Sequence, residues 1–123
     1  MLPPLPMLTT KNRAGTFCLA LAVGLLTSCA PPGPRALLEG KRLLEEGKYA
    51  QAVEKLKVAT SLLATNANGW SYLGLACHRA GQVTNATQAY QKALKLNPDL
   101  VEVRFNLGCL YLEQNQLEPA KAN

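Results

Sequence analysis

Apolar residues recur at helical spacing along most of this 123-residue chain. From Arg35 onward they return every three or four residues, and no stretch alternates apolar and polar residues as a half-buried strand would. The pattern predicts an all-α fold with helices at 35–46, 49–63, 67–80, 83–96, 99–114 and 117–122. Asn66 and Asn97 are predicted to cap the helices that follow them, with Pro98 in a first helical turn.

The helical pattern repeats with a period of 34 residues, which divides the chain into blocks 33–66, 67–100 and 101–123. Small residues occupy the eighth and the twentieth place of every block: Gly40, Gly74, Gly108, Ala52, Ala86 and Ala120. Such places indicate close contacts between helices, because a larger side chain would push the helices apart. Gly47 and Gly81 fall where the first helix of a block is predicted to end, in a left-handed conformation that suits glycine.

The middle block resembles the tetratricopeptide repeat, a helix–turn–helix unit of about 34 residues. It carries the signature residues of that family, namely Trp70, Leu73, Gly74, Gly81, Ala86, Tyr90, Ala93 and Pro98. The first block keeps fewer of them, and the third is partial. The resemblance implies a solenoid of about two and a half repeats over residues 35–123. The partial third repeat predicts either a fragment of a longer array or a homodimer formed through this end.

The N-terminal segment has the pattern of an export signal. Lys11 and Arg13 precede an apolar run of 13 residues from Ala14 to Leu26, whereas a membrane-spanning helix needs about 20. The run therefore predicts a signal peptide over residues 1–28. Residues 29–34 contain three prolines and a glycine, and they are predicted to form a non-helical spacer before the repeats.

The end of the apolar run, Leu26-Thr27-Ser28-Cys29, resembles the lipobox of bacterial lipoproteins. The resemblance implies cleavage before Cys29 and attachment of acyl chains to it, which would anchor the protein to a membrane of the bacterial cell envelope. Ala30, where an Asp would retain the protein at the inner membrane, favours the outer membrane with the repeats facing the periplasm.

Charge and cysteine content narrow the function. The net charge is +5, but basic and acidic residues are interleaved, so no basic stripe predicts a nucleic-acid partner. His78 is the single histidine, and no pair of cysteines has the spacing of a zinc site. No set of catalytic residues and no glycine-rich phosphate loop is apparent, so no metal, no cofactor and no enzymatic activity is predicted.

The family resemblance also implies a groove along the first helices that binds a peptide or an amphipathic helix of another protein. Its predicted lining is Leu37, Lys41, Leu44, Asn68, Ser71, Leu75, His78, Glu102, Phe105, Asn106, Cys109 and Leu112. For the four leucines, packing between neighbouring repeats is the first interpretation. The leading hypothesis is a lipid-anchored protein-interaction module. The alternatives are a soluble periplasmic or secreted repeat protein, an accessory subunit of an envelope enzyme, and a fragment of a longer array.

Overall fold

The structure is a computed structural model that describes residues 30–122, with side chains described as far as Asn115. In this part of the chain the elements are helices only: α2 Pro32–Glu45, α3 Tyr49–Leu62, α4 Ala67–Arg79, α5 Val83–Leu96 and α6 Val101–Ala122. The predicted all-α fold is confirmed. The predicted signal peptide, 1–28, and the predicted lipidation site, Cys29, lie outside the described residues.

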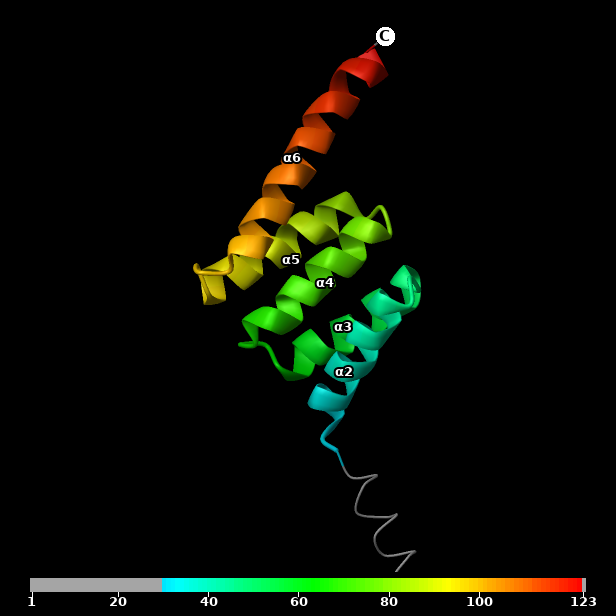
Figure 1. The fold of residues 1–123 in the computed structure, drawn as a ribbon, viewed down its shortest axis with the longest axis vertical. Helices are drawn as coiled ribbons and strands as arrows, with labels where there is room; N and C mark the ends of the chain where they lie inside the picture. The colour runs from blue at the N-terminus through cyan, green and yellow to red at the C-terminus, as the bar shows by residue number, and fades with distance from the viewer. Residues whose placement is uncertain (1–29, 123) are drawn as a thin grey trace, which may run out of the picture. The chain divides into compact units, whose positions relative to one another are not determined.

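The helices form two antiparallel hairpins followed by a single helix (Figure 1). Helix α2 packs on α3, α4 packs on α5, α3 contacts α4 between the hairpins, and α6 packs on α5. Each hairpin turns at a glycine in the left-handed region, Gly47 with φ 74° and Gly81 with φ 77°. The residue after each glycine, Lys48 or Gln82, donates its backbone N–H back into the helix at 2.9 and 2.8 Å. The two turns are therefore built alike, as the 34-residue period predicts.

The residue at the eighth place of a block limits how closely the two helices of its hairpin can pack. A Cβ atom built on Gly40 would lie 2.5 Å from Cγ of Leu56, and one on Gly74 would lie 2.5 Å from the ring of Tyr90. Both distances are shorter than real carbon–carbon contacts, so only glycine fits. The interpretation of these glycines as close helix contacts is confirmed for the first two blocks. At Gly108 a Cβ would meet nothing within 4 Å.

One core runs through the hairpins and into α6. Its buried side chains include Leu43, Val53, Leu56, Cys77, Tyr90, Val103 and Leu110. Helix α4 starts as predicted, because the Asn66 side chain accepts a hydrogen bond of 3.0 Å from the backbone N–H of Gly69. The indole of Trp70 donates to the carbonyl of Ala64 at 2.8 Å, which fixes the loop between the hairpins.

The start of the first hairpin differs from the prediction. Helix α2 begins at Pro32, so Pro32, Gly33 and Pro34 form its first turn instead of belonging to a spacer. The prediction treated the three prolines of residues 29–34 as helix breakers. In the first turn the backbone N–H groups have no partner within the helix, so proline loses nothing there, and its fixed φ favours the helix.

The end of the chain differs more. The predicted helices 99–114 and 117–122 are one continuous helix, α6, which begins at Val101. The third block has Asn115 at the place of Gly47 and Gly81, and no glycine lowers the cost of a left-handed turn there. The predicted cap at Asn97 is also wrong: its side chain accepts from the N–H of Asp99 at 3.0 Å, in a turn that precedes α6.

Candidate binding groove

A hollow of about 400 Å³ opens between α2 and α4. It forms because corresponding helices of successive repeats lie next to each other, so that equal places of the 34-residue period face a common surface. Its lining is Lys41, Leu44, Glu45, Tyr49, Tyr72, Leu75 and Arg79. Most of the lining therefore comes from the first helix of each hairpin, and Tyr49 comes from the first residue of α3.

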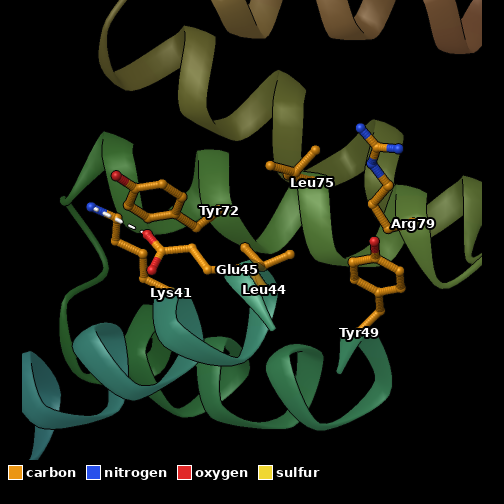
Figure 2. A pocket seen from close by; sticks show the side chains of 7 residues that line it. All are labelled: Lys41, Leu44, Glu45, Tyr49, Tyr72, Leu75 and Arg79. Carbon is orange, nitrogen blue, oxygen red and sulfur yellow. Dashed lines mark ion pairs between the residues drawn. The ribbon is translucent and has the colours of Figure 1, made fainter. Parts of the chain in front are cut away.

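Figure 2 shows an apolar centre between two polar ends. Leu44 and Leu75 lie in the middle, and both are half-buried. Lys41 lies at one end, where it forms an ion pair of 3.9 Å with Glu45 and places its ammonium 5.8 Å from the centre of the Tyr72 ring. This arrangement suits a large apolar side chain in the centre, held between hydrogen-bonding groups.

Two further hollows share residues with the first. Leu75 and Arg79 also line a hollow of about 420 Å³, whose other residues are His78, Asn106, Cys109 and Glu113. Lys41 and Tyr72 also line one of about 360 Å³, together with Pro34, Leu37, Leu38, Leu63 and Asn66. The three hollows make one surface along α2, α4 and α6, which we call the groove.

The charges of the groove alternate along it. Glu45, Arg79 and Glu113 occupy the same place, the thirteenth, of the three blocks. Glu45 is paired with Lys41, and Glu113 Oε2 lies 3.0 Å from His78 Nε2, which ties α6 to α4. Within the described part of the chain Arg79 is exposed and makes no ion pair. Arg79 is therefore the cation that remains available to a carboxylate of a ligand.

The twelve sequence-predicted residues divide into two groups. Seven line the groove: Leu37, Lys41, Leu44, Leu75, His78, Asn106 and Cys109. The other five do not line these three hollows: Asn68 and Ser71 on α4, and Glu102, Phe105 and Leu112 on α6. The packing interpretation agrees with Leu37 and Leu44, which are half-buried against the core. It does not describe Leu112, which is 64% exposed.

Sequence reasoning missed Glu45, Tyr49, Tyr72, Arg79 and Glu113. Four of these occupy the sixth or the thirteenth place of a block. Most of the prediction was drawn from the fifth, ninth and twelfth places, which are either adjacent to these two places or about one helical turn away. Comparing the blocks at the thirteenth place would have found the alternating charges. Tyr49 gave no such signal, because it belongs to a second helix of a hairpin.

The cysteines of the described region do not form a reactive or metal-binding cluster. Cys77 is buried in the core, and burial raises the pKa of its thiol. Cys109 is half-buried at the edge of the groove, and both thiols are free. Among residues 30–122, no three His, Cys, Asp or Glu side chains gather as metal ligands would. In the same residues no helix is both long and apolar enough to cross a membrane.

Comparison with known proteins finds relatives that share the repeat pattern. A family model described as TPR repeat matches residues 74–115. Tetratricopeptide repeat protein 37 of Xenopus laevis is 31% identical over 83 residues, which cover 67% of this chain and 5% of that protein. Protein O-mannosyl-transferase TMTC1 of Homo sapiens is 28% identical over 96 residues, 74% of this chain and 11% of that protein. The chain thus spans a small part of the curated relatives it matches.

A solved structure of the MamA RS-1 ArsTM double mutant superimposes with a TM-score of 0.66 at 23% identity, covering 73% of this chain and 51% of that one. A likeness of this kind shows the fold. The chain is similar to tetratricopeptide-repeat proteins, and its described helices have the all-α solenoid fold of that family.

Proposed function

We propose that this protein is a protein-interaction module, which binds an extended peptide or an amphipathic helix of another protein in the groove. The observation that carries the proposal is the continuity of the three hollows, joined through Lys41, Tyr72, Leu75 and Arg79. A continuous surface with an apolar centre and polar ends binds chain segments, whereas a small-molecule site is enclosed.

The groove specifies the chemistry of its ligand. A large apolar side chain would fill the space between Leu44 and Leu75. An acidic residue next to it would pair with Arg79, whose guanidinium can bind a carboxylate through two hydrogen bonds. Glu45 and Glu113 lie on either side of that position and would disfavour a second acidic residue nearby. We therefore infer a segment with one large apolar and one acidic residue.

We further propose that the module acts by binding, without catalysis, at a bacterial cell envelope. The support is the lipobox-like sequence ending at Cys29 and the positively charged, apolar segment before it. An acyl anchor at Cys29 would place the groove near the membrane surface, facing the periplasm. The alternatives are a soluble exported protein, an accessory subunit of an envelope enzyme, and a piece of a longer array.

The groove is tested with two charge-reversed variants of the full chain. Arg79→Glu changes the groove, and Lys92→Glu makes the same change of charge at an exposed residue outside it, which lines a separate hollow together with Trp70 and Ala89. Each protein carries a C-terminal tag and is purified from detergent-solubilised membranes, and bound proteins are quantified by mass spectrometry. We expect a partner that Lys92→Glu retains and that Arg79→Glu loses at least about tenfold. Equal recovery by both variants would contradict binding through the groove.

The anchor is tested separately by detergent phase partition. The wild type is expected in the detergent phase, and Cys29→Ala in the aqueous phase, because an acylated cysteine provides the apolar anchor. If both forms partition into water, the acyl anchor is contradicted, and the groove remains as proposed.

A further inference from the structure

Helix α6 exposes an apolar stripe that the groove does not use. The side chains of Val101, Phe105 and Leu112 are 71%, 70% and 64% exposed, and Gly108 lies between the last two. The four residues follow one another at intervals of four, three and four, so they lie on one face of the helix. This spacing is that of the contact positions in paired helices.

The same places are covered in the two complete hairpins. Gly40 is covered by Leu56 and Gly74 by Tyr90, whereas no described side chain covers Gly108. Leu37 and Leu44, which occupy the places of Phe105 and Leu112 in the first block, are half-buried against the rest of the core. The stripe is therefore a helix-packing surface that lacks its partner among the described residues.

We propose that the stripe binds the α6 helix of a second copy of this chain, antiparallel and centred on Gly108. Phe105 and Leu112 are placed nearly symmetrically about this residue, three residues before it and four residues after it, whereas Val101 lies beyond this symmetric part of the stripe. A twofold axis through Gly108 places Phe105 of each copy against Leu112 of the partner subunit. The two glycines meet at the crossing, where the absence of side chains lets the helices approach closely.

The residues beside the stripe are consistent with this orientation. Arg104 and Tyr111 lie on one flank of it, and both are exposed. In the antiparallel pair Arg104 lies next to Tyr111 of the partner subunit, and a guanidinium binds an aromatic face favourably. A parallel pair would instead align the two helix dipoles and set Phe105 against its own copy. The groove side of α6, with Asn106 and Cys109, stays free, so the dimer does not depend on the proposed function.

The size of the stripe sets the strength of the interaction. Aromatic side chains present about 150–250 Å² each when fully exposed, so the stripe and its flanks offer on the order of 400 Å² of apolar surface per copy. A pair of such surfaces buries on the order of 800 Å², which is less than stable specific interfaces bury and corresponds to weak association. We expect a dimer with a dissociation constant on the order of 10 μM. In a small interface, the loss of translational and rotational freedom on association cancels most of the favourable free energy of burial.

The test measures the mass of the full chain in mild detergent by light scattering that separates protein from detergent, between about 1 and 100 μM. The wild type is expected to reach the dimer mass, and Phe105→Glu is expected to stay monomeric. Leu38→Glu is the matched control, because Leu38 is equally exposed, 71%, but lies on α2. Circular dichroism checks that each variant is folded.

A second variant determines the orientation. The double variant F105E/L112K places opposite charges against each other only in the antiparallel pair, and it is expected to recover at least half of the dimer lost in F105E. In a parallel pair like charges would meet, and the double variant would stay monomeric. A wild type that remains monomeric at 100 μM, or a dimer equally sensitive to Leu38→Glu and Phe105→Glu, would overturn the proposal.

Discussion

The two ends of the helical array are built from the same places of the 34-residue period, but with opposite chemistry. The third, seventh and tenth places of the first block are Arg35, Glu39 and Arg42, on α2, the first helix of the described residues. In the third block the same places are Val103, Leu107 and Leu110, all buried against the preceding hairpin. Among the described residues no helix covers this side of α2, and a polar set suits such a face, because its members can interact with water and with neighbouring charges.

The opposite face of α6 continues the comparison. On α2 the face toward the next helix is covered, and ion pairs cross its outer side, with Glu39 bound to Lys55 at 3.3 Å and Arg42 bound to Glu46. On α6 the corresponding face presents Val101, Phe105 and Leu112 to solvent. A solenoid end with polar residues needs no partner, whereas an apolar end is a surface for another helix.

The largest effect of a substitution on stability is expected at the tenth place, where the side chain is buried on α6 and exposed on α2. Leu110→Ala removes a fully buried side chain between α6 and α5 and should lower the free energy of unfolding by about 3 kcal/mol. Arg42→Ala changes the same place on α2, where the side chain is exposed, and should cost less than about 0.5 kcal/mol. Urea unfolding followed by circular dichroism measures both. Equal decreases in the free energy of unfolding for the two variants would mean that the outer face of α2 is not exposed to solvent.

The next effect separates a covered glycine from an open one. Gly74→Ala forces a methyl group against the Tyr90 ring and should destabilise the protein by about 2 kcal/mol. Gly108→Ala adds its methyl group to open space and should stabilise α6 by about 0.5–1 kcal/mol, because alanine favours the helix. Thermal unfolding at about 1 μM keeps both proteins monomeric under the affinity proposed above. A destabilised Gly108→Ala at that concentration would show that the end is already covered.

The smallest effect concerns the side chain that covers Gly74. Burial raises the pKa of Tyr90 to about 12 from 10.0, while the nearby Asn106 side chain lowers it, and no contact of the Tyr90 hydroxyl with the described residues has the geometry of a hydrogen bond. The folded protein therefore keeps this proton while the unfolded chain releases it, so the stability due to Tyr90 is complete below pH 10 and falls as the pH rises toward 12.

Tyr90→Phe removes that titration. Relative to the variant, the wild type should lose about 1 kcal/mol of stability between pH 9 and 11. At pH 7 the variant should be at least as stable as the wild type, because it buries no unpaired hydroxyl. Denaturant unfolding at the three pH values checks both statements. Parallel curves across this range would contradict the burial of a protonated phenol.

The sequence alone determined the helical class, the 34-residue period and the two glycine turns. These features depend on short-range rules: apolar spacing selects the helix, and Gly47 and Gly81 adopt left-handed angles that other residues avoid. Seven of the twelve predicted groove residues line the groove for the same reason, since equal places of successive repeats face the same side. Partner binding, lipidation and the envelope location remain predictions.

Only the tertiary structure decided the helix limits at both ends and the composition of the groove. Pro32 begins α2, and α6 continues past Asn115, because a helix end is a balance of small local energies that a single turn residue can shift. Arg79 enters the groove because two hairpins pack side by side, which brings it near Tyr49, thirty positions earlier in the chain. Long-range packing of this kind also decides which apolar positions are buried and which stay exposed. Gly74 and Gly108 occupy the same place of the repeat in the sequence, but among the described residues only Gly74 is covered by a neighbouring helix.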